Sequence, residues 1–179
     1  FKKSRDAQNT VCAPMLNFML GDRHIRKMAA RPLHARYGHV DEPRAAGGLK
    51  VAFYPGCMGD KMYVDMAEAC LKALRHHKVA VYMPRGLACC GIPALSSGDA
   101  RGMVAQMKIS LELLEQGSFD YLVTPCGSCT ATIREYWPMY ADRLGAGMKR
   151  LADDLAAKTM DINQFLVDVL RVEAAVPSE

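Results

Sequence analysis

Five of the seven cysteines fall into a pattern that indicates one site for a soft metal or a redox centre. They are Cys57, Cys89, Cys90, Cys126 and Cys129. Thiolates are the ligands preferred by zinc, Cu(I) and iron–sulfur clusters. The total number of cysteines is odd and four of them sit in two tight pairs, unlike the disulfide framework of a small secreted protein. We therefore expect metal or redox chemistry in a reducing compartment.

Three short apolar runs, each ended by proline or close to one, predict strands that would bring these cysteines together. The runs are Lys50–Tyr54, Val79–Met83 and Tyr121–Thr124. Segments with helical spacing separate them, at residues 62–77 and in a helix capped by Asp99 and ended by Gly117. Alternating strands and helices imply parallel βαβ units. Because the cysteines follow the three strands, we expect them to meet at the carboxyl edge of one sheet.

The sequence therefore predicts an α/β fold, with a small parallel sheet of three to four strands and flanking helices built as Rossmann-like βαβ units. Helical extensions are expected at both ends. Residues 1–30 have helical spacing, and residues 31–49 contain prolines and glycines and predict a linker. Helices are also expected at about 128–136, over 139–155 and over 161–170, where Asp161 opens the last one.

The ligand pattern favours an iron–sulfur cluster over a single zinc ion. A closed zinc site takes four ligands and would leave one thiol over, whereas the adjacent pair Cys89-Cys90 can reach two irons of one cluster. Glycines next to the ligands, at Gly56, Gly91 and Gly127, would leave room for a cluster. Structural zinc and thiol–disulfide chemistry stay open as alternatives, since Cys-x-x-Cys at a helix start is also a redox motif.

Other candidate residues have simpler interpretations. Cys70 and Cys12 lie in apolar segments, where a free cysteine is usually a small buried hydrophobe. Histidines 76 and 77 close a predicted helix, where cations complement the dipole. His34 has no partner at a ligand spacing. Ser96, Ser97 and Thr130 are candidate hydrogen-bond donors to a cluster or to a substrate sulfur.

Composition excludes two classes of protein. The net charge is +4 and half of the residues are hydrophobic, without the basic stripes of a nucleic-acid binder. No apolar run approaches the roughly 20 residues that a transmembrane helix needs, and no stretch has the layout of a signal peptide. We expect a cytoplasmic protein with no nucleic-acid partner and no transmembrane segment in this chain.

The cysteine spacing resembles that of a known family. The pattern Cys57-x31-Cys89-Cys90-Gly91-x34-Cys126-x2-Cys129, with the words FYPGCMGD, ACCGIPALSSGD and TPCGSC, resembles the cysteine-rich CCG domain. That domain occurs in heterodisulfide reductase and in iron–sulfur subunits of lactate, glycolate and anaerobic glycerol-3-phosphate dehydrogenases. The resemblance covers about residues 50–145.

The resemblance implies that all five cysteines bind a [4Fe–4S] cluster, which is non-cubane in heterodisulfide reductase. It implies an oxidoreductase subunit that passes electrons between a flavoprotein dehydrogenase and a quinone or disulfide acceptor. Other iron–sulfur or membrane subunits would be partners and would hold it at the cytoplasmic membrane. A catalytic heterodisulfide-reductase-like subunit and a structural zinc-binding module are the alternatives.

The resemblance also implies a division of the chain. Residues 1–49 would be a helical segment and linker, and residues 50–145 the CCG domain. Residues 146–179 would be a helical extension that leads to a second CCG domain, because family members usually carry two in tandem.

Overall fold

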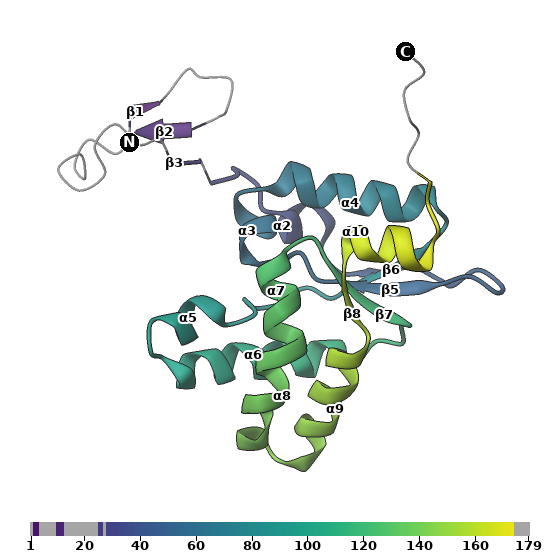
Figure 1. Ribbon diagram of the computed structural model, residues 1–179. Helices are drawn as coiled ribbons and strands as arrows, with labels where there is room; N and C mark the ends of the chain where they lie inside the picture. The colour runs from purple at the N-terminus through teal and green to yellow at the C-terminus, as the bar shows by residue number, and fades with distance from the viewer. Residues whose placement is uncertain (1, 4–9, 13–24, 27, 174–179) are drawn as a thin grey trace.

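A five-stranded sheet forms the centre of the computed structural model, which describes residues 2–3, 10–12, 25–26 and 28–173. The strand order is β4-β6-β5-β7-β8, and β5 to β8 are parallel while β4 pairs antiparallel with β6 at one edge (Figure 1). The strands are β4 (Val40–Asp41), β5 (Lys50–Phe53), β6 (Ala80–Met83), β7 (Tyr121–Thr124) and β8 (Thr159–Asp161). This confirms the predicted α/β class with a small parallel sheet.

Two layers of helices cover the sheet (Figure 1). One face is covered by α2 (Leu33–Tyr37), α4 (Val64–His76) and α10 (Ile162–Gln164). A π-helical segment (Phe165–Val169) extends α10, and α3 (Gly56–Lys61) packs beside α2 and α4. The other face carries α5 (Ile92–Ser96), α6 (Ala100–Leu114), α7 (Gly127–Ala131), a π-helical segment (Thr132–Tyr136), α8 (Trp137–Tyr140), a 3₁₀ turn (Ala141–Leu144) and α9 (Ala146–Ala157). Among the described residues, none of these helices has the length and apolar character that crossing a membrane requires.

Side chains of the central strands alternate between two cores. Ala52 and Leu122 point into the cluster under α6 and α9, whereas Val51, Phe53 and Val123 point into the cluster under α4 and α10. All five are fully buried. A strand covered on both faces is apolar at every position, which explains why these strands appear in the sequence as continuous apolar runs.

The strand order creates a crevice at one edge of the sheet. Side by side in the sheet, the four parallel strands have the order β6-β5-β7-β8, although β5 comes first along the chain. The connection from β5 to β6 runs over the α4 face, and the connection from β6 to β7 runs over the α6 face. The order therefore reverses between β5 and β7, and open α/β sheets bind their ligands at such a point, beyond the carboxyl ends of the strands.

Most of the predicted helices are confirmed, with their caps. The Asp99 carboxylate accepts a hydrogen bond from the Gly102 amide at 2.8 Å and opens α6. The Asp161 carboxylate accepts one from the Asn163 amide at 2.9 Å and opens α10. Both aspartates satisfy amides that a helix start leaves without a partner.

The predicted N-terminal helix is wrong for the described part of residues 1–30. Three short strands, β1 (Lys2–Lys3), β2 (Thr10–Cys12) and β3 (Ile25–Arg26), pair there as a separate antiparallel sheet. The remaining residues of that segment, up to 27, lie outside the described ones. The predicted linker over 31–49 also contains regular structure, namely α2 and β4.

Candidate metal centre

The five cysteines follow three neighbouring strands at the carboxyl edge of the sheet. Cys57 lies in the first turn of α3, directly after β5. Cys89 and Cys90 lie in the loop between β6 and α5. Cys126 is the N-cap residue of α7 and Cys129 lies in its first turn, directly after β7. The reversal between β5 and β7 therefore lies between Cys57 and the α7 pair.

Four of the five sulfurs form one row of contacts. The Cys89 Sγ lies 3.3 Å from the Cys57 Sγ, and the Cys90 thiol hydrogen-bonds to the thiols of both Cys89 and Cys129. Cys126 is outside this row but only one helical turn before Cys129, and the Thr130 amide donates to its carbonyl at 2.9 Å. The structure thus brings four of the five predicted cysteines together, and Cys126 begins the helix that carries the last of them.

The row has a buried end and an accessible end. Cys90 and Cys129 are only 1% and 4% exposed. Cys57, Cys89 and Cys126 are partly exposed. A centre held here would therefore be screened from water on its inner side and approachable from the side of Cys57 and Cys89.

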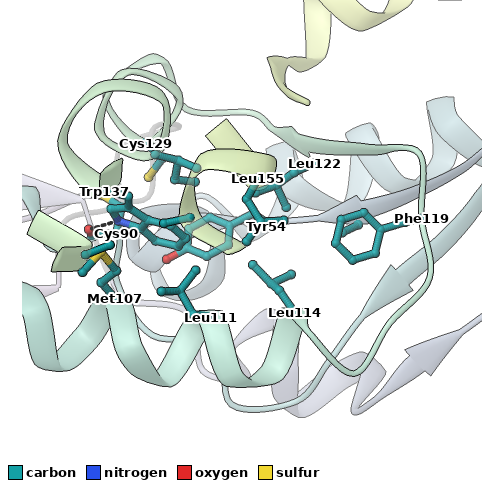
Figure 2. Packing of buried hydrophobic residues seen from close by; sticks show 14 of the residues in the cluster. Tyr54, Cys90, Met107, Leu111, Leu114, Phe119, Leu122, Cys129, Trp137 and Leu155 are labelled. Carbon is teal, nitrogen blue, oxygen red and sulfur yellow. Dashed lines mark hydrogen bonds between the residues drawn. The ribbon is translucent and has the colours of Figure 1, made fainter. Parts of the chain in front are cut away.

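Two buried aromatic residues position the loop that carries the adjacent cysteines. The Tyr54 hydroxyl donates to the Ala88 carbonyl at 2.6 Å, and the Trp137 indole Nε1 donates to the Cys90 carbonyl at 2.9 Å. The two rings meet edge to face at 6.1 Å. Figure 2 shows them side by side, between Cys129 and the α6 side chains. Ser110 of α6 completes the support by accepting from the Ala88 amide at 3.2 Å.

Two glycines are required by the close packing around the thiols. Gly91 has φ +95°, and a Cβ there would lie 2.7 Å from Met103 Cγ and 3.1 Å from Met103 Cα. Gly56 has φ +69°, and its Cβ would lie 2.9 Å from the Cys129 Sγ. At both positions the backbone is left-handed and an added Cβ would lie too close to a neighbouring atom, so glycine is favoured there. Gly127 differs, because a Cβ there would meet no protein atom within 4 Å.

The surroundings of Cys57, Cys89 and Cys90 favour the protonated form of these three thiols. Burial, followed by the hydrogen bond with Cys89, raises the pKa of Cys57. The hydrogen bond with Cys90 and then burial raise the pKa of Cys89 strongly. The hydrogen bond with Cys129 raises the pKa of Cys90 to about 11. Backbone amides of Met58, Gly91 and Ile92 act in the opposite direction, because they donate to these sulfurs.

Comparison with known proteins identifies a family domain in this part of the chain. The family model described as the CCG cysteine-rich domain matches residues 51–134, a range that contains all five cysteines. The chain contains a CCG domain. The CCG domain here thus comprises the β5, β6 and β7 units together with the three loops that carry the thiols.

Relatives of this CCG chain are bacterial proteins named lactate utilization protein A. The chain is 34% identical to the one from Shouchella clausii and 35% identical to the one from Geobacillus thermodenitrificans, each over 125 residues. Each match covers 70% of this chain and 51% of the relative. The chain therefore spans about half the length of these curated relatives. No solved structure matches it significantly.

A cleft of about 410 Å³ adjoins the accessible end of the sulfur row in the CCG domain. Cys57 and Cys89 line it together with His34 and Asp60. No group of three or more His, Cys, Asp or Glu side chains in the described part of the chain is arranged to hold a metal ion.

The other sequence candidates take structural roles. Thr130 donates its hydroxyl to the Cys126 carbonyl at 3.1 Å, and Ser97 donates to the Pro93 carbonyl at 2.9 Å, so neither hydroxyl is directed to a thiol. Ser96 is exposed at the end of α5. Cys70 is half-buried against the core under α4, as expected of a packing residue. The side chain of Cys12 lies outside the described residues.

Sequence reasoning missed Tyr54, Ser110, Trp137 and the pairing of His34. Tyr54 directly precedes the Pro-Gly-Cys turn, and a tyrosine that ends a buried strand needs a partner for its hydroxyl, which is a local signal. Trp137 gives no such signal, since its partner is 47 residues away. His34 pairs with Asp60, 26 residues away, through its Nδ1 at 2.7 Å from the Asp60 Oδ2.

Proposed function

We propose that this chain is the iron–sulfur electron-transfer subunit of an oxidoreductase complex that acts in the oxidation of a hydroxy acid such as lactate. Its electron donor would be a flavoprotein dehydrogenase, and its acceptor a quinone or a disulfide. The observation that carries the proposal is the row of four sulfurs, Cys57, Cys89, Cys90 and Cys129, with Cys126 one turn away. The names of its relatives support the choice of hydroxy acid.

The residues of the site fit an iron–sulfur cluster. Five soft sulfur donors are present, and the adjacent pair can serve different irons. Gly56 and Gly91 keep side chains out of the space around the sulfurs. Amide groups of Met58, Gly91 and Ile92 donate to the sulfurs, and such hydrogen bonds tune the reduction potential of a cluster. When bound, the cluster would supply reversible one-electron chemistry.

The chain's own residues hold the ligands and limit access to them. The start of the helical run formed by α7, its π-helical extension and α8 lies at Cys126 and Cys129, where the positive end of the dipole favours thiolates. Tyr54 and Trp137 fill the inner side of the site and exclude water. Electron exchange with partners is therefore expected on the side of Cys57 and Cys89.

Anaerobic reconstitution tests this function. The wild-type protein should bind iron and acid-labile sulfide in stoichiometric amounts and give a reducible chromophore. Cys90→Ser and Cys129→Ser should lose most of the iron, whereas Cys70→Ser, the matched control on α4, should retain it. A colourless protein with one zinc ion per chain would contradict the electron-transfer role and favour a structural zinc module.

A further inference from the structure

The peptide group that joins Cys90 to Gly91 is hydrogen-bonded at both of its ends. Its carbonyl oxygen accepts the 2.9 Å bond from the Trp137 indole, and its N–H, the Gly91 amide, donates to the Cys89 sulfur. A peptide group is planar, and in the trans form found here its C=O and N–H point to opposite sides. The group therefore links the indole to a thiol through a series of two hydrogen bonds.

The next peptide group has the same arrangement with a different donor. The Gly91 carbonyl accepts from the Leu95 amide of α5 at 3.0 Å, and the Ile92 amide donates to the Cys90 sulfur. Here a backbone amide takes the place of the indole. Of the two successive N–H groups that bind cysteine sulfurs, the Gly91 amide is therefore the one that a side chain orients.

The surroundings of the loop leave this peptide group little freedom to turn. Trp137 is fully buried, so water does not replace the indole as the donor. Ala88, earlier in the same loop, is held at its carbonyl by the Tyr54 hydroxyl at 2.6 Å and at its amide by Ser110 at 3.2 Å. The direction of the Gly91 amide therefore depends on the position of the indole.

A series of hydrogen bonds transmits the strength of its first donor. In the low dielectric of a protein interior, linked bonds polarise one another by roughly 10–30% per bond. Donation by the indole therefore makes the Gly91 amide a stronger donor to the Cys89 sulfur. A hydrogen bond to a charged group favours its more negative state, and hydrogen bonds to the sulfurs help to set the reduction potential of an iron–sulfur cluster.

We propose that Trp137 is a positioning residue that raises the reduction potential of the proposed metal centre, because it directs the Gly91 amide at the Cys89 sulfur. The indole acts through the peptide group and is not itself a metal ligand. The effect on the potential rests on the proposed function, whereas the orientation of the amide does not. The two are therefore measured separately.

The single tryptophan of the sequence allows a sharp test, because growth on a tryptophan analogue changes position 137 alone. The 4-fluoro, 5-fluoro and 6-fluoro forms all strengthen the indole N–H as a donor but carry fluorine at different points of the ring. After anaerobic reconstitution, equilibration with a redox dye should show an at least twofold shift towards the reduced cluster for each form. Trp137→Phe should shift the equilibrium the other way, and growth of this variant on the analogues should change nothing further.

The orientation of the amide is tested without any metal. In the metal-free protein, hydrogen exchange of the Gly91 amide should be at least tenfold faster in Trp137→Phe than in the wild type. Tyr82→Phe is the matched control, since it removes another hydroxyl of the same core, which donates to the Leu113 carbonyl at 2.8 Å. This control should change neither the exchange of the Gly91 amide relative to other core amides nor the potential.

The outcomes separate this proposal from the proposed function. No shift with any fluorinated form overturns the role of the indole in the potential. Shifts whose sign depends on the fluorine position also overturn it, because they would report the fluorine dipole rather than the N–H. Unchanged exchange of the Gly91 amide in Trp137→Phe overturns the positioning role. Uptake of zinc in place of iron and sulfide, with the expected exchange result, rejects the electron-transfer function and any effect on a potential but supports the orientation of the amide.

Discussion

The Trp137 indole donates a hydrogen bond of 2.9 Å to the backbone carbonyl of Cys90, 47 residues earlier in the chain. The bond connects α8 to the loop after β6, and both partners are buried. Tyr54 binds the same loop from the end of β5. The position of the adjacent cysteines therefore depends on the packing of the hydrophobic core around them (Figure 2).

Replacing the indole should destabilise the protein and loosen the site. Trp137→Phe leaves the Cys90 carbonyl buried without its donor, which costs about 1–3 kcal/mol of unfolding free energy, and it removes side-chain volume as well. Urea denaturation measures the loss, and iron content after reconstitution should fall. Tyr140→Phe, at the partly exposed end of α8, is the control and should change neither quantity appreciably. Equal stability of Trp137→Phe and wild type would show that this bond does not hold the loop.

Gly91→Ala should abolish assembly of the site. The added Cβ would lie 2.7 Å from Met103 Cγ and 3.1 Å from its backbone Cα, so α6 would have to shift away from the loop. Gly98→Ala is a matched control, because Gly98 also has a positive φ, of +83°, but nothing within 4 Å of its Cβ. We expect Gly98→Ala to show only the conformational penalty, about 1–2 kcal/mol, and full iron content. Similar iron uptake by both variants would contradict the steric explanation.

Asp99→Ala should lower stability without affecting metal uptake. The carboxylate caps α6 through the Gly102 amide, and loss of an N-cap costs about 1 kcal/mol. Asp154→Ala, at an exposed position on α9, should change the unfolding free energy much less. Urea denaturation of the two variants gives the comparison. A loss of iron in Asp99→Ala would mean that the start of α6 takes part in forming the site.

Removal of the metal followed by exposure to air should produce a specific disulfide. The Cys57 and Cys89 sulfurs lie 3.3 Å apart at the accessible end of the row, and dioxygen would take up the two electrons that the thiols release. Peptide mapping by mass spectrometry should find a bond between Cys57 and Cys89, while Cys70 stays reduced. A predominant bond between Cys89 and Cys90 would contradict the order of contacts described here.

Local patterns accounted for much of this fold. The three strands that precede the cysteines are short apolar runs, and β6 and β7 stop directly before a proline. Asp99 and Asp161 cap helices as expected. Strand β8 escaped prediction, because three residues carry no pattern and their extended form comes from pairing with β7. The same reason applies to the short N-terminal strands. Apolar residues in that segment have helical spacing, but the described residues pair as strands instead.

The sequence indicated which cysteines would lie close together, but not which residues hold their loops in place. Cysteine spacing and parallel topology together indicated that the thiols would meet, because both are readable along the chain. The partners of Cys90, Ala88 and His34 are distant in sequence, and only the packed core brings them near. No sequence pattern pointed to Gln106. It stands out because its buried side-chain oxygen accepts no hydrogen bond from any described residue.

The thiols lie in three successive connections between strands, and this determines when the set can be complete during synthesis. No continuous segment shorter than the stretch from Cys57 to Cys129 contains the whole set, and the indole that fixes the middle loop comes later still. An emerging nascent chain therefore cannot present a finished site until Trp137 has left the ribosome. A factor that delivers a cluster to the proposed site would therefore meet a folded domain rather than an extended peptide.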